Sequence, residues 1–153
     1  MISGMTLMTL IEQVGAAFIG TVAFALLFGV PKKYYLMCGI VAAIGWLLYY
    51  ILSFTTLSAT ECTFFATLLV ILLSRYASVW MRCPVTVFLT TGIFPLIPGG
   101  GIYWTAYYMV MGETSLAAES GFNAIKSVLA IVLGIVIVLE LPRKMFVIPH
   151  KSR

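Results

Sequence analysis

The sequence predicts an all-α integral membrane protein, a bundle of five transmembrane helices whose fourth helix is broken at residues 95–101. Two observations about composition carry this prediction. Of the 153 residues, 62% are hydrophobic and only 9% are charged, and the mean hydropathy is +1.10. A soluble domain has about 25% charged residues. At about 20 residues for each span, a chain of this length has room for five crossings.

Five hydrophobic segments follow one another, and the short connections between them leave no room for a soluble domain. We therefore expect one transmembrane domain over residues 1–153. Prolines at three segment boundaries support this division, because a proline is tolerated where a helix starts or stops. The expected spans are 7–30, 34–54, 62–80, 85–111 and 124–141.

The fourth segment is the longest and contains its own helix breakers. A continuous helix of its length would be about 40 Å long, whereas the hydrocarbon core of a bilayer is about 30 Å thick. Pro95 and Pro98 each lack an amide donor, and Gly99, Gly100 and Gly101 follow directly. We therefore expect one half-helix, a break near residues 97–101 and a second half-helix. The alternative is a surface loop between two short helices.

The distribution of basic residues predicts the orientation. If the chain crosses five times, eight of its nine Lys and Arg residues fall on one side, which indicates the cytoplasm. The opposite connections carry Glu61, Glu113 and Glu119, with Lys126 as the remaining cation. The N-terminus is therefore expected outside and the C-terminus inside. The eight residues are Lys32, Lys33, Arg75, Arg82, Arg143, Lys144, Lys151 and Arg153.

No pattern typical of an enzyme is present. The sequence has no Ser-His-Asp set, no H-E-x-x-H and no phosphate-binding loop, and His150 is its only histidine. Three cysteines without C-x-x-C spacing indicate neither a disulfide framework nor a metal site. We expect no catalysis, no metal and no cofactor, and the net charge of +4 does not indicate nucleic-acid binding.

The break itself is the predicted binding site. A helix that restarts near Gly101 has free amide groups in its first turn, and these groups attract a carboxylate. Glycines let a ligand reach the backbone, and tyrosines four residues apart follow on one face. The half-helix before the break contributes a threonine, which alternatively bonds to its own helix. The predicted substrate-binding residues are Pro98, Gly99, Gly100, Gly101, Tyr103, Tyr107 and Thr90.

Glu12 is the candidate for coupling transport to an ion gradient. A carboxylate inside a membrane span is costly, so it is a functional candidate by default. Glu12 would carry a proton or pair with a positive group. If the first helix begins at Glu12, the residue is instead an ordinary interfacial charge.

The run F-P-L-I-P-G-G-G-I-Y, residues 94–103, resembles the threonine/serine exporter (ThrE-like) family, in particular its short five-span half. The resemblance implies gradient-driven export of small metabolites, such as threonine, serine or small dicarboxylates, across the bacterial cytoplasmic membrane. It also implies a larger membrane partner subunit of the same family, and a homo-oligomer is compatible with it. The alternatives are a non-transporting membrane scaffold and a small ion channel.

Overall fold

A computed structural model describes residues 7–141, and within that range every regular element is a helix. This confirms the predicted all-α fold. Four helical stretches are long and apolar enough to cross a membrane, and a bent pair of shorter helices would make a fifth span. The elements are α1 (Leu7–Leu27), η1 (Lys32–Tyr34), α2 (Tyr35–Leu52), α3 (Ala59–Met81), α4 (Val85–Ile93), η2 (Phe94–Leu96), α5 (Gly99–Val110) and α6 (Thr114–Glu140).

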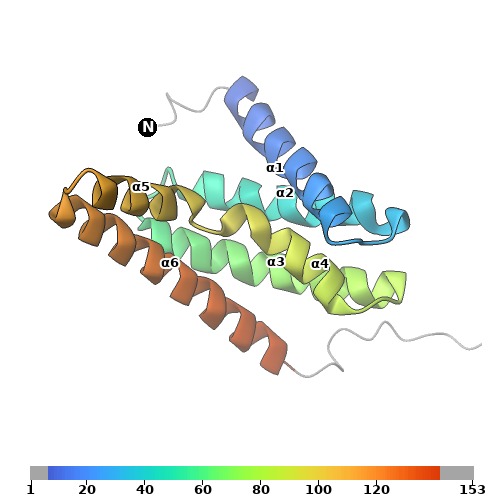
Figure 1. The fold of residues 1–153 in the computed structure, drawn as a ribbon. Helices are drawn as coiled ribbons and strands as arrows, with labels where there is room; N and C mark the ends of the chain where they lie inside the picture. Colours follow the sequence, from blue (N-terminus) through green and yellow to red (C-terminus); the bar gives the residue numbers. More distant parts are fainter. Residues whose placement is uncertain (1–6, 142–153) are drawn as a thin grey trace, which may run out of the picture.

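The helices run back and forth between two ends of an elongated bundle (Figure 1). The α1–α2 and α3–α4 connections lie at one end, and the α2–α3 and α5–α6 connections lie at the other. Helix α3 is central, because it packs against α2, α4 and α6. Helix α1 packs mainly on α2, whereas α5 packs on α6.

Small residues hold the central helices close together. A Cβ atom at Gly45 of α2 would lie 2.2 Å from Cγ2 of Val70 on α3, so the two helices meet where the side chain is missing. Close approach at small residues is the usual way in which helices associate in lipid. One buried cluster around this contact joins α2, α3 and α6 with the break, and consists of Val41, Ala66, Val70, Leu96 and Ile131.

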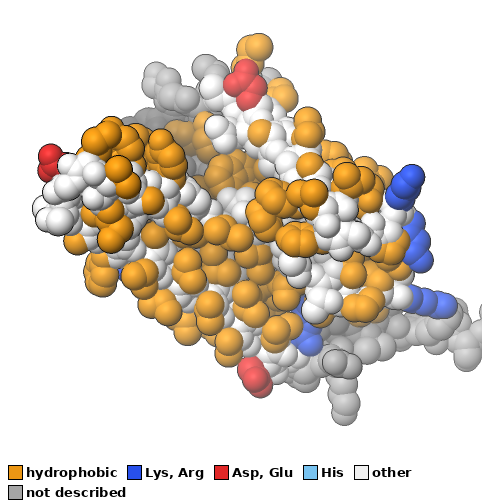
Figure 2. Space-filling model, viewed as in Figure 1, with side chains coloured by type: hydrophobic (Ala, Val, Ile, Leu, Met, Phe, Trp, Pro, Cys, Tyr) orange, Lys and Arg blue, Asp and Glu red, His pale blue; other side chains and the backbone are white. Residues whose placement is uncertain are grey.

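The face of the molecule seen in Figure 2 is largely apolar. Large hydrophobic side chains such as Ile19, Leu129 and Leu133 are exposed. Soluble monomeric proteins rarely expose extended apolar surface of this kind to water. Lys and Arg side chains gather mainly at one end in this view. This surface fits a multi-pass membrane protein, whose apolar side chains face lipid.

Two helices begin earlier than the hydrophobic pattern predicted. Helix α3 starts at Ala59, because Ser58 and Glu61 form a reciprocal capping box, and the predicted segment began at residue 62. Helix α6 starts at Thr114, ten residues before the predicted segment, so the expected connection over 112–123 is mostly helical. This polar part of α6 is held by packing: a Cβ at Gly121 would lie 3.2 Å from Cγ2 of Thr105 on α5.

Candidate functional site

The predicted break is present between α4 and α5, and the two helices are bent by 50° relative to each other. Helix α4 ends at Ile93, and a single 3₁₀ turn, η2, follows. Ile97 is extended, with φ −62° and ψ 129°, and Pro98 precedes the first residue of α5. The prolines explain the interruption, because neither Pro95 nor Pro98 has an amide hydrogen for the helical ladder.

The three glycines lie in the first turn of α5, so the irregular backbone ends before Gly99 and not at Gly101 as predicted. Packing accounts for this difference. A Cβ at Gly101 would lie 3.1 Å from Cβ of Ala124, so glycine there allows α5 to approach α6 closely. Cβ atoms at Gly99 and Gly100 would meet nothing within 4 Å, so these two positions border open space.

The break leaves backbone donors and acceptors without partners. The Gly99 amide donates to Ile97 O at 2.7 Å, and the Ile102 amide donates to Pro98 O at 3.1 Å. Between them, the amides of Gly100 and Gly101 have no hydrogen-bond partner among the described residues. A helix N-terminus with free amides carries a partial positive charge. The site therefore offers two unpaired donors at the positive end of a helix.

Carbonyl oxygens are free on the other side of the same break. In residues 7–141, neither Pro95 O nor Leu96 O accepts a hydrogen bond from a backbone amide of the connecting segment. The donor that would reach Pro95 O in a continued 3₁₀ turn belongs to Pro98, which has none. The break thus has donors and acceptors a few residues apart.

These groups line a pocket of about 320 Å³. Helices α2, α3 and α6 form its other walls, and none of the described residues that line it is charged. Its lining residues are Trp46, Tyr49, Ala59, Thr63, Pro95, Leu96, Ile97, Pro98, Gly99, Gly100, Gly101, Asn123, Ala124 and Ser127.

Aromatic rings and hydroxyls form the walls of this pocket. The rings of Trp46 and Tyr49 stack at 5.1 Å, and Trp46 Nε1 donates a hydrogen bond to Gln13 Oε1 of α1 at 3.2 Å. The hydroxyls of Thr63 and Ser127 instead donate to carbonyls of their own helices. The pocket walls are therefore largely apolar and contain only a few polar side chains. Small-molecule sites have the same character.

The structure brings four of the seven predicted binding residues, Pro98 and the three glycines, to this pocket. Tyr103 and Tyr107 stack on one face of α5, with ring centroids 6.4 Å apart, but they are 62% and 40% exposed and do not line the pocket. Thr90 is exposed on α4 and also lies outside it.

Glu12 lies in the second turn of α1, on an exposed position. It lines neither this pocket nor the smaller cavity beside α1 described below. Because α1 includes every residue from Leu7 to Leu27, Glu12 is inside the helix and is not its first residue. Its role in coupling stays a prediction.

Sequence reasoning missed the side walls of the pocket, which include Trp46, Tyr49, Thr63 and Asn123. These residues come from three helices other than the broken one, and each has an ordinary explanation as a packing or interfacial residue. Only the tertiary arrangement brings them to the break.

Comparison with known proteins gives one match. A family model described as "Threonine/Serine exporter, ThrE" matches residues 13–140, which is most of the chain. No curated protein matches the sequence, and no solved structure matches the fold.

Proposed function

The chain belongs to the threonine/serine exporter family, and from this premise we propose that it is one subunit of a secondary transporter that exports threonine, serine or a similar small carboxylate-bearing metabolite. In this proposal the protein moves its substrate unchanged and catalyses no reaction. The observation that carries the proposal is the pocket at the break, where the Gly100 and Gly101 amides have no hydrogen-bond partner within residues 7–141.

A carboxylate is the ligand that best fits these amides. An unpaired amide in a medium without water costs several kcal/mol, so the two groups require a partner. A carboxylate accepts from both at once and also interacts favourably with the positive end of α5. Interrupted helices that present such ends to a substrate carboxylate are a recurring arrangement in secondary transporters.

The absence of charge in the pocket lining favours an amino acid over a dicarboxylate. A second carboxylate would need a cation or further donors, and no Lys or Arg of residues 7–141 lines the pocket. An amino acid is neutral overall, and its ammonium group is a donor for the free carbonyl oxygens of Pro95 and Leu96. A zwitterion therefore matches both sides of the break.

We propose that α5 is covered by a larger partner subunit of the same family. No residue of α5 is buried, and α6 is the one helix against which it makes extensive contacts. We also propose that the membrane is the bacterial cytoplasmic membrane, with the N-terminus outside. The pocket then opens toward the outer side, because Ala59 at the start of α3 is one of its walls.

Reconstitution tests this function. Proteoliposomes would contain the chain alone, a larger subunit of the family alone, or both together, and would be loaded with labelled L-threonine, L-serine or succinate. We expect saturable efflux of the two amino acids, stimulated by an ion gradient, and little efflux of succinate. Passive ion conductance without saturable efflux would instead indicate a channel. Equal flux with and without this chain would indicate a scaffold.

A further inference from the structure

A second, smaller cavity lies on the other side of the break, between α1 and η2. Its volume is about 150 Å³, several times the roughly 30 Å³ that one water molecule occupies in the liquid. Pro95 lines both this cavity and the larger pocket, so the two share one residue of the broken segment. The lining residues are Ala16, Ala17, Gly20, Thr21, Phe24, Phe94 and Pro95.

The hydroxyl of Thr21 is the unusual group in this cavity. Thr21 is 1% exposed, and its Oγ1 is the one buried side-chain oxygen or nitrogen without a hydrogen-bond partner in the described part of the chain. Other helical hydroxyls donate to the carbonyl four residues earlier, namely those of Thr63, Thr67, Ser74, Thr91, Thr105 and Ser127. The Thr21 hydroxyl does not donate to the carbonyl four residues earlier, although Thr21 is inside α1 and has such a carbonyl.

A buried hydroxyl without a partner costs free energy unless water or a ligand satisfies it. The other walls of the cavity are methyl groups, aromatic rings and a proline, so the hydroxyl has no alternative partner among their side chains. Thr21 is therefore the one residue with a polar side chain among the described residues that line this apolar cavity, which lies directly beside the break.

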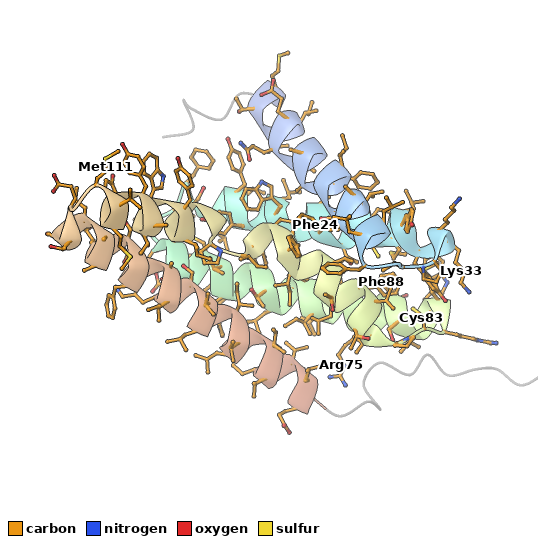
Figure 3. All side chains as sticks on the ribbon, viewed as in Figure 1. Phe24, Lys33, Arg75, Cys83, Phe88 and Met111 are labelled. Atoms are coloured by element: carbon orange, nitrogen blue, oxygen red, sulfur yellow. The ribbon has the colours of Figure 1, made fainter. Side chains whose placement is uncertain are left out.

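Two aromatic rings, those of Phe24 and Phe94, line this cavity, and the ring of Phe28 packs against both of them. The ring centroids of Phe24 and Phe94 are 3.6 Å apart, and Phe28 lies 5.8 Å from Phe94. Phe28 follows the last residue of α1, close to the connection that carries Lys32 and Lys33. Figure 3 shows Phe24 where α1 crosses α4, toward the end at which Lys33 lies. The rings thus stand between the cavity and the basic end of the bundle.

We propose that the Thr21 cavity is a second binding position for the exported amino acid, which the solute occupies before it passes Pro95 into the larger pocket. This inference rests on the proposed function. The solute arrives past Phe24, Phe28 and Phe94 from the basic, cytoplasmic end. The Thr21 hydroxyl donates to the solute carboxylate or accepts from its ammonium group, and the side chain of the solute faces the apolar walls.

Site-directed cysteine labelling tests this position in membrane vesicles that contain the full chain. Cys38, Cys62 and Cys83 are first replaced by alanine. Thr21→Cys then reports on the new cavity, and Asn123→Cys reports on the larger pocket. Thr67→Cys is the matched control, because Thr67 is also buried but bonds to its own helix and lines neither cavity. The probe is a small methanethiosulfonate reagent, with and without L-threonine.

We expect Thr21→Cys and Asn123→Cys to react and L-threonine to slow both reactions, while Thr67→Cys stays unreactive. If only Asn123→Cys is protected, or if Thr21→Cys does not react, the Thr21 cavity is not a second binding position. The larger pocket then remains the proposed substrate site. If L-threonine and L-serine protect neither cysteine, the proposed function fails as well. The two failures are therefore distinguishable.

A hydroxyl deletion gives an independent test that leaves the volume nearly unchanged. Thr21→Val should lower the rate of L-threonine efflux roughly threefold to tenfold, the worth of one hydrogen bond, with equilibrium binding to the larger pocket nearly unchanged. Thr21→Ser should restore the rate, and Thr67→Val should preserve the ratio of efflux to binding. Efflux of Thr21→Val at the unmodified rate would overturn the proposal.

Discussion

Helix α3 packs against α4, but α3 and the α4–α5 pair differ in how their backbone hydrogen bonds are satisfied. Helix α3 is continuous over 23 residues, is capped by Ser58 and Glu61 at its start, and ends at Arg82 in the left-handed conformation. The α4–α5 pair is interrupted by two prolines, and in the described part of the chain the Gly100 and Gly101 amides have no hydrogen-bond partner.

The same contrast appears in side-chain packing. Eight residues of α3 are buried, against three helices, whereas no residue of α5 is buried. Most of the packing energy is therefore in the helices that hold the break in place. The break itself has open space and unpaired polar groups, which stability alone does not explain. The well-packed helices are therefore the scaffold, and the break is the candidate site. Substitutions in the scaffold should affect stability, whereas substitutions in the site should affect transport.

The largest effect is expected in the scaffold. Gly45→Val places a side chain where a Cβ atom alone would lie 2.2 Å from Cγ2 of Val70, a buried β-branched residue with few alternative rotamers. Overpacking of this kind typically costs about 1–3 kcal/mol, so the yield and melting temperature of the detergent-solubilised protein should fall. Gly15→Val is the control, since a Cβ at Gly15 meets nothing within 4 Å. Equal stability of the two variants would contradict the packing described here.

In contrast to Gly45→Val, Gly100→Val should leave folding nearly unchanged and lower transport. A Cβ at Gly100 meets nothing within 4 Å and the residue is helical, so the protein should fold with a yield close to normal. The side chain would occupy the space beside the free amides. L-Threonine efflux should fall roughly tenfold to hundredfold, because hydrogen bonds to a charged group are worth about 1.5–3 kcal/mol. Gly100→Ala should be milder, and full transport by the valine variant would exclude the break as the site.

Glu12→Gln tests coupling separately from binding. Glu12 is exposed on α1 and does not line the pocket, so the folded protein should be produced at normal levels. Gradient-driven efflux should fall severalfold, whereas exchange of labelled for unlabelled L-threonine without a gradient should persist. Unchanged gradient-driven efflux with unchanged pH dependence would show that Glu12 has no part in coupling.

Tyr103→Phe should have the smallest effect. The Tyr103 ring is 62% exposed on α5 and does not line the pocket, so loss of its hydroxyl removes no contact with a solute there. We expect efflux to stay close to that of the unmodified protein in the same proteoliposome assay. A loss as large as that of Gly100→Val would instead place Tyr103 in the site, in an arrangement that α5 adopts with a partner.

The interrupted helix was predictable because its cause is local. Pro95 and Pro98 lack amide donors whatever surrounds them, and the excess length of the fourth segment indicates the same feature. The start of α6 was not predictable from hydropathy, because its first turns are polar and are held by the contact between Gly121 and Thr105.

The walls of the pocket depend on tertiary structure. Trp46 and Tyr49 belong to α2, and Asn123 belongs to α6, so their presence beside Gly100 follows from how the helices pack. The unusual state of Thr21 is equally invisible in the sequence, where it is one threonine among several in apolar segments. It is recognised only when each buried hydroxyl is compared with the carbonyl that it could reach.

The most direct test of the central claim is an experimental structure of the protein in a lipid nanodisc with saturating L-threonine. The account predicts the solute in the pocket at the break, with its carboxylate about 3 Å from the amide nitrogens of Gly100 and Gly101. An unbroken helix over residues 85–110, or a solute bound away from these amides, would contradict it.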